Sequence, residues 1–92
     1  MIKSFKCRDT KALFEGLRSA RFANIEKVAR RKLEMLDAAT RLGDLRIPPA
    51  NRLEALHGNR KGQHSVRIND QWRVCFEWRA GDAYNVEIVD YH

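Results

Sequence analysis

The sequence contains few cysteines and few prolines. Of its 92 residues, two are cysteine and two are proline. Cys7 and Cys75 lie far apart and form neither a CxxC pair nor a zinc-binding spacing. Both fall in alternating, strand-like runs, so we expect buried, reduced thiols and no bound metal.

Long apolar runs are also missing. No run could cross a bilayer, and the first residues lack the apolar core of a signal peptide. The chain has no internal repeat, no low-complexity segment and no glycine motif that would cradle a phosphate. We therefore expect residues 1–92 to form one domain with a single modest core, no cofactor, no membrane contact and a cytoplasmic location.

Acidic side chains are outnumbered by basic ones. Lys and Arg total 18 against 12 Asp and Glu, which gives a formal net charge of +6. This excess favours RNA, DNA or an acidic protein as a partner. A solvated basic surface without any partner is the alternative.

The N-terminal part predicts a short strand followed by a helix. Residues 2–7 alternate between apolar and polar side chains, as in a strand. Asp9 or Thr10 can then cap a helix over residues 11–15, and Gly16 suits its exit.

A second helix is predicted over residues 25–39, with Asn24 as its cap. Its apolar side chains recur at steps of three and four residues and form one core-facing stripe: Ile25, Val28, Ala29, Leu33, Leu36 and Ala39. Its charged side chains fall mostly off the stripe: Lys27, Arg30, Arg31 and Glu34. We interpret them as a solvated face, with contact to the acidic surface of a partner as the alternative.

The second half of the chain predicts an antiparallel sheet. After a proline-stiffened connector, residues 52–56 form a weak edge strand and residues 57–62 a polar loop. Three stronger strands follow, over residues 63–68, 72–79 and 84–89. The turns between them are too short for anything but an antiparallel meander.

The period of two sorts the strand residues onto two faces. The apolar residues should form the face of the sheet that packs against the helices: Val66, Ile68, Trp72, Val74, Phe76, Trp78, Val86 and Ile88. The other set should form an open polar face: Ser65, Arg67, Arg73, Cys75, Glu77, Asn85 and Glu87. The predicted fold is a two-layer α+β domain, with two N-terminal helices packed on one face of a small antiparallel sheet.

The polar face and the end of the chain gather groups that suit metal-free RNA cleavage. That reaction needs a base for the 2′-hydroxyl, a cation for the phosphorane-like charge and an acid for the departing 5′-oxygen. The available groups are Arg67 and Arg73 on the strands, His57, Arg60 and Lys61 in the loop, and Asp90, Tyr91 and His92 at the end. The alternative for Arg73 is a purely structural pair with Glu77 or Glu87.

Several motifs resemble the HigB-like (host inhibition of growth) branch of the RelE/ParE toxin superfamily. They are MIKSF at 1–5, LDAAT at 36–40, KG at 61–62 followed by SVR at 65–67, WRV at 72–74, GDAY at 81–84 and the closing DYH at 90–92. The resemblance covers essentially the whole chain, and its ordered combination of motifs is specific.

The resemblance implies a RelE-like fold and a toxin that cleaves mRNA in the ribosomal A site. It also implies a helix-turn-helix antitoxin, which alone contacts operator DNA, and a 70S ribosome as the second partner. By the same resemblance, His92 with Asp90 handles protons, Tyr91 positions a base and Arg73 clamps the phosphate. His57 would assist, while Arg60, Lys61, Arg67 and the basic second helix would contact RNA or the ribosome.

The chain departs from the family pattern in one loop, where family members commonly read Leu-His-Pro-Leu-Lys-Gly. Here Glu54 replaces the histidine and His57 replaces the lysine. A carboxylate can act as a base, but it repels phosphate. Glu54 therefore leaves open a catalytically weakened module that only binds its antitoxin. A second alternative is a gyrase-inhibiting toxin of the ParE kind, because the same fold serves such toxins, although the closing Asp90-Tyr91-His92 argues against it.

Overall fold

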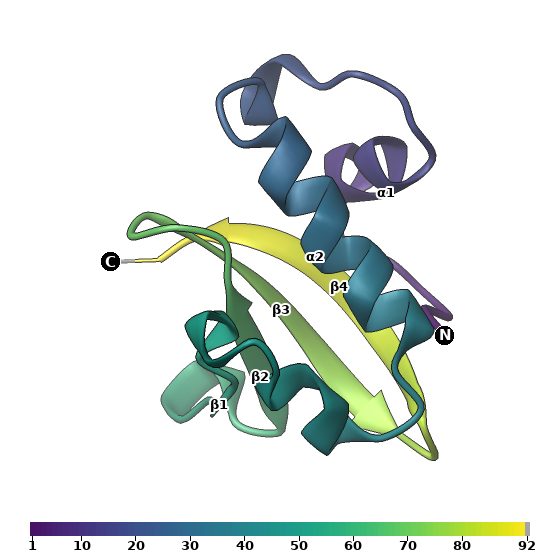
Figure 1. The fold of residues 1–92 in the computed structure, drawn as a ribbon, viewed down its shortest axis with the longest axis vertical. Coiled ribbons are helices and arrows are strands. Elements are labelled where there is room, and N and C mark those ends of the chain that lie inside the picture. The colour runs from purple at the N-terminus through teal and green to yellow at the C-terminus, as the bar shows by residue number, and fades with distance from the viewer. Residues whose placement is uncertain (92) are drawn as a thin grey trace.

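A computed structural model describes residues 1–91; His92 lies outside the described residues. Within this range two α-helices pack on one face of a four-stranded sheet (Figure 1). The helices are α1 (Arg8–Phe14) and α2 (Glu26–Ala38), and the strands are β1 (Glu54–Ala55), β2 (Gln63–Arg67), β3 (Trp72–Arg79) and β4 (Asp82–Asp90). Four short 3-10 helices are η1 (Ala20–Phe22), η2 (Leu42–Arg46), η3 (Pro49–Asn51) and η4 (Gly58–Arg60). This arrangement confirms the predicted α+β fold.

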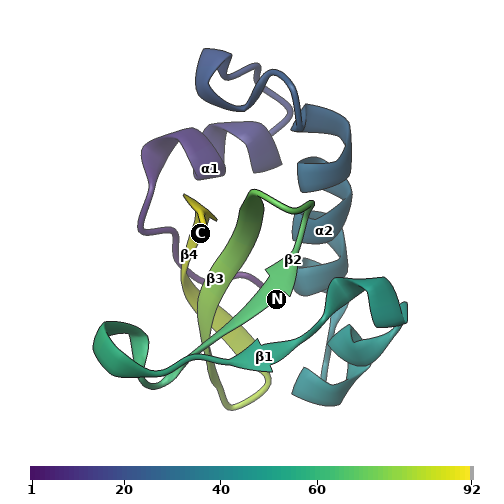
Figure 2. The ribbon, with the colours of Figure 1, turned by 90° about the vertical axis from the view of Figure 1, so that its left-hand side faces the viewer.

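The sheet is an antiparallel meander in the order β1-β2-β3-β4. The weak edge strand expected over residues 52–56 is present as the two-residue β1, far from α1 (Figure 2). The bounds of β3 match the prediction, and β4 extends the predicted strand at both ends. No helix among residues 1–91 is long and apolar enough to cross a membrane.

The first strand, expected over residues 2–7, is only partly formed. Its residues run parallel to β4 and make two isolated bridges, Ile2 with Ala83 and Phe5 with Val86. Between these bridges Asn85 has a φ of +53°, and the pairing of β3 with β4 shifts at the same place. This bulge interrupts the regular spacing that a continuous ladder needs.

The predicted caps of both helices are wrong. The α1 helix begins at Arg8, and the hydroxyl of Thr10 instead accepts a hydrogen bond from the backbone N–H of Ile88 at 3.0 Å. Thr10 is fully buried, so it satisfies a strand N–H that would otherwise have no partner in the core. The α2 helix follows Ile25 and not Asn24, and its N-cap makes no side-chain hydrogen bond.

The core lies between the helices and the sheet, as the two apolar patterns predict. Most of the α2 stripe is buried against the apolar face of the strands, and Val28 packs at its edge. The two tryptophans lie at the margins of this core. Trp72 meets Phe22 edge to face at 5.5 Å, and Trp78 meets Phe76 at 6.3 Å.

The centre of the opposite face of the sheet is buried, whereas an open face was predicted. Ser65 and Cys75 are fully buried and Arg73 is 8% exposed. Segments outside the sheet cover them, because the carbonyl of Arg52 and the side chain of Arg60 both fold over this face. Cys75 is thus a buried free thiol, as expected, and burial raises its pKa.

A buried polar contact ties α2 to the connector before β1. The ammonium group of Lys32 donates to Oδ1 of Asn51 at 2.5 Å, and Nδ2 of Asn51 donates to the carbonyl of Leu45 at 3.1 Å. Lys32 is 9% and Asn51 1% exposed, and burial lowers the pKa of Lys32. Removing Asn51 leaves the Lys32 ammonium group without this acceptor, and removing Lys32 leaves Oδ1 of Asn51 without its donor.

We expect Asn51→Ala to lower the free energy of unfolding by about 2–4 kcal/mol, because it strands a buried ammonium group. Urea unfolding followed by circular dichroism measures this loss. The double variant Lys32→Met/Asn51→Leu removes both partners and should lose less. An equal loss in both variants would mean that the polar contact is not what matters at this position.

Candidate active site

The buried guanidinium of Arg73 is the centre of the covered face of the sheet. Its Nε donates to Oγ of Ser65 at 2.8 Å, and its Nη2 donates to the carbonyl of Arg52 at 2.6 Å. Nη2 also lies 3.9 Å from Oε1 of Glu54. The expected alternative, a pair with Glu77 or Glu87, is therefore wrong, because the edge-strand carboxylate takes that place.

Arg52 holds its carbonyl toward Arg73 from an unusual conformation. Its φ of 45° and ψ of 58° are left-handed, which is uncommon for a residue other than glycine. Such a backbone costs of order 1 kcal/mol or more. A charge-assisted hydrogen bond from a buried guanidinium can offset that cost.

The end of β4 brings an aromatic ring to the same place. Asp90 accepts a hydrogen bond from Nε2 of Gln71 at 3.1 Å, and the N–H of Tyr91 donates to the carbonyl of Gln71 at 2.6 Å. The turn before β3 thereby holds residues 90 and 91 in position. The Tyr91 ring centroid lies 5.5 Å from the guanidinium carbon of Arg73, within cation–π range, and Tyr91 is 39% exposed.

Arg60 reaches the same face from η4. Its Nη1 lies 2.9 Å from Oε1 of Glu87 and 3.1 Å from Oε1 of Gln63. The pKa of Arg60 is raised, mainly by the hydrogen bond to Glu87, and the nearby Tyr91 phenol acts in the same direction. Arg60 is thus tied to β4 through Glu87 and to β2 through Gln63.

Three other predicted site residues, His57, Lys61 and Arg67, make none of the contacts that hold this cluster together. His57 precedes η4, is exposed and makes no side-chain hydrogen bond or ion pair with any of residues 1–91. Lys61 is exposed at the end of η4. Arg67 is the cross-strand neighbour of Arg73, but its guanidinium lies 2.5 Å from Asp70, whose pKa it lowers. The predicted proton-transfer residue His92 lies outside the described residues.

The structure brings in three groups to which the sequence assigns no role. They are the Ser65 hydroxyl, the Arg52 carbonyl and the Gln71 side chain. Alternation places Ser65 and Arg73 on one face, so their contact could have been anticipated. No sequence pattern identifies a backbone carbonyl as a ligand, and Gln71 reads as an ordinary turn residue.

The arrangement offers a clamped cation, a second cation, a ring and several carboxylates on one surface. Such a surface can hold a phosphodiester and stack a base. Among residues 1–91, no cluster of three or more His, Cys, Asp or Glu side chains could hold a metal ion.

Comparison with known proteins identifies the family. Residues 3–92 match the model of HigB-like toxins, described as RelE-like toxins of the type II toxin–antitoxin system HigB. Toxin HigB-1 of Vibrio cholerae is 54% identical over 63 residues, which are 68% of this chain and 66% of that protein. Endoribonuclease HigB of Proteus vulgaris is 38% identical over the full length of both chains.

Solved structures agree on the fold. A toxin chain in the heterotetrameric YoeB-YefM toxin–antitoxin complex of Staphylococcus aureus superimposes with a TM-score of 0.58, at 18% identity. That match covers 100% of this chain and 98% of the other. The fold and the family model together confirm the resemblance found in the motifs. The chain belongs to the HigB-like family, the RelE-like toxins of type II toxin–antitoxin systems.

Proposed function

We propose that this chain is a toxin with endoribonuclease activity, which cleaves mRNA in the ribosomal A site without a metal. The family assignment and the full-length relative named Endoribonuclease HigB support ribonuclease activity. The observation that carries the proposal is the buried Arg73 guanidinium, fixed by Ser65 and Arg52 beneath the Tyr91 ring.

In this proposal Arg73 stabilises the charge that develops on the scissile phosphate. A donor fixed before the substrate arrives needs no reorganisation during the reaction, which is the main source of electrostatic catalysis. Tyr91 stacks on a base, and Arg60 supplies a second positive charge. His92 and Asp90 exchange protons with the reacting oxygens, with His57 as an auxiliary group.

The proposed partners are those of a ribosome-associated toxin. A helix-turn-helix antitoxin would bind the chain and inhibit it. Operator DNA would be contacted by the antitoxin and not by this chain. The solved complexes that share this fold are toxin–antitoxin assemblies, which supports an antitoxin partner. Lys61 and Arg67 would contact ribosomal RNA, with Arg67 first exchanging Asp70 for phosphate. The gyrase-inhibitor alternative is not favoured by a family model and relatives of the HigB kind.

One observation keeps the catalytically weakened module as a second candidate. Glu54 stands where the family pattern has a histidine, and its carboxylate lies 3.9 Å from Arg73. As a base it would receive the proton of the 2′-hydroxyl. If it takes no part in proton transfer, it would repel the phosphate and occupy the position beside the Arg73 guanidinium.

We expect Arg73→Ala to lower A-site cleavage by at least about a hundredfold, because removal of one preorganised donor typically costs that much. Cell-free translation with mapped mRNA 5′ ends measures the cuts. Arg8→Ala, at an exposed arginine with no contact to this cluster, should cleave like the wild type. The nuclease proposal fails if the wild type gives no A-site cuts even at high concentration.

Substitution of Glu54 separates its two proposed roles, a base that acts beside His92 and Asp90 or a carboxylate that hinders phosphate binding at Arg73. If Glu54 is the base, Glu54→Gln should lower cleavage by about two to four orders of magnitude, and Glu54→His should retain much of it. If Glu54 only hinders phosphate binding at Arg73, Glu54→Gln should cleave faster than the wild type. Cleavage rates measured against pH complete the test, because loss of a base removes the low-pH limb of the profile.

A further inference from the structure

The segment that carries Arg52 toward the Arg73 site is exposed along most of its length. Residues 46–50 are all exposed, and so is Arg52. Asn51 is the exception, because it is only 1% exposed. On the N-terminal side of Arg52, packing of apolar side chains therefore does not fix the backbone. The contacts that fix it there are those of Asn51.

The side-chain amide of Asn51 has partners at both ends. Its Oδ1 accepts a hydrogen bond from the ammonium group of Lys32 on α2 at 2.5 Å. Its Nδ2 lies 3.1 Å from the carbonyl oxygen of Leu45 and 3.4 Å from that of Ile47. A buried amide with its donor and its acceptor both engaged is held in one orientation. Asn51 thus fastens the connector before β1 to α2.

Two adjacent residues of this connector meet two buried cations. The side chain of Asn51 binds Lys32, and the carbonyl of Arg52 accepts a hydrogen bond from the guanidinium of Arg73 at 2.6 Å. The backbone is also fixed between these contacts. The N–H of Asn51 donates to the carbonyl of residue 48 at 2.9 Å, and the N–H of Arg52 donates to that of residue 49 at 3.1 Å. A shift of Asn51 would therefore move the carbonyl that holds Arg73.

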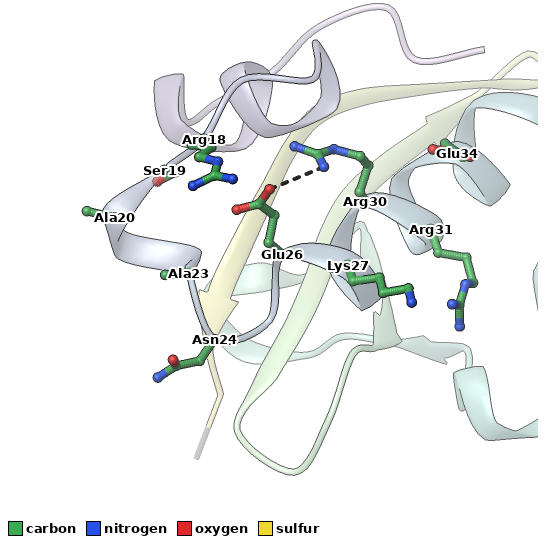
Figure 3. A pocket seen from close by; sticks show the side chains of 10 residues that line it. All are labelled: Arg18, Ser19, Ala20, Ala23, Asn24, Glu26, Lys27, Arg30, Arg31 and Glu34. Atoms are coloured by element: carbon green, nitrogen blue, oxygen red, sulfur yellow. Dashed lines mark ion pairs between the residues drawn. The ribbon is translucent and has the colours of Figure 1, made fainter.

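Lys32 differs from its charged neighbours on α2. Arg30, Arg31 and Glu34 line a surface recess of about 870 Å³ beside the helix (Figure 3). Lys32 is instead 9% exposed, and burial lowers its pKa. A buried ammonium group is costly unless it is hydrogen-bonded. Movement of Asn51 would leave this group without its acceptor, so the bond to Lys32 restrains Asn51.

We propose that Asn51, held by Lys32, is a positioning residue for Arg73. Through the adjacent carbonyl of Arg52 it sets the place of the guanidinium before a substrate arrives. The consequence for RNA cleavage rests on the proposed function, whereas the consequence for the geometry of Arg73 rests on these contacts alone. A displaced guanidinium should slow the chemical step and leave the affinity for the ribosome unchanged, because preorganisation acts on the transition state.

NMR spectroscopy of the arginine side chains tests the geometry without a substrate. The Nε and Nη resonances of Arg73 can be assigned by through-bond correlation from its backbone. In Asn51→Ala the Arg52 carbonyl loses its fixed position, so these resonances should shift and the Nη protons should exchange faster with water. Arg73 resonances that match those of the wild type would overturn the proposal.

Two control variants separate positioning from a general loss of stability. Leu13→Ala removes a fully buried side chain of α1 and should lower stability while the Arg73 resonances stay in place. Lys32→Met/Asn51→Leu removes both buried polar partners and should regain part of the stability that Asn51→Ala loses. Because it lacks the polar anchor beside Arg52, its Arg73 resonances should stay displaced, and it carries the test if Asn51→Ala does not fold. Wild-type resonances in this double variant, or displaced ones in Leu13→Ala, would contradict the positioning role.

Cleavage of mRNA on programmed ribosomes measures the functional consequence. At a temperature where all variants are folded, kcat of Asn51→Ala and of the double variant should fall about tenfold to a hundredfold, with KM within about twofold of the wild type. Leu13→Ala should keep both constants. Displaced Arg73 resonances with an unchanged kcat would refute the role in catalysis and leave the nuclease proposal intact. A wild type that gives no A-site cuts would refute the nuclease, and the NMR comparison would still decide whether Asn51 positions Arg73.

Discussion

The buried guanidinium of Arg73 is the constraint around which the covered side of the sheet is organised. A charge this far from solvent is tolerated only with hydrogen bonds to fixed partners. Those partners come from β2 through Ser65 and from the segment before β1 through Arg52, whose backbone is left-handed. The same cation then faces the Tyr91 ring. One buried charge thus connects the edge of the sheet with the end of β4.

The positive charge of the chain is divided between groups with different roles. Arg30 and Arg60 are held by internal carbonyls or carboxylates, and Arg67 by a turn. Lys27 and Arg31, on either side of Arg30 in the sequence of α2, remain exposed. The net charge of +6 does not distinguish the cations that are held by internal partners from the cations that remain exposed. Which cations can meet a partner depends on the contacts that the fold has already satisfied.

The sequence predicts the fold well where a single period governs the side chains. Alternation places Val74 and Phe76 in the core, and helical spacing places Leu33 and Leu36 against them. Prediction fails where tertiary contacts override local preference. Thr10 looks like a helix cap but serves a strand N–H far away in sequence.

The candidate site is less predictable than the fold for the same reason. Alternation assigns Arg73 to a polar face, and from this we expected an open surface. Coverage of that face depends on loops whose path has no periodic signal. The left-handed Arg52 and the tether from Gln71 are therefore visible only in the structure.

The distance between Glu54 and Arg73 also limits how a substrate can bind under the proposed function. At 3.9 Å the pair is loose, and the Glu54 side chain is 51% exposed. A phosphate that approaches Arg73 would form shorter, charge-assisted hydrogen bonds and would compete with this carboxylate for Nη2. Binding of the substrate would then displace Glu54 from the guanidinium and leave its carboxylate beside the bound nucleotide. If Glu54 is the base, the group that opposes phosphate binding before the substrate arrives would then be the group that accepts a proton afterwards.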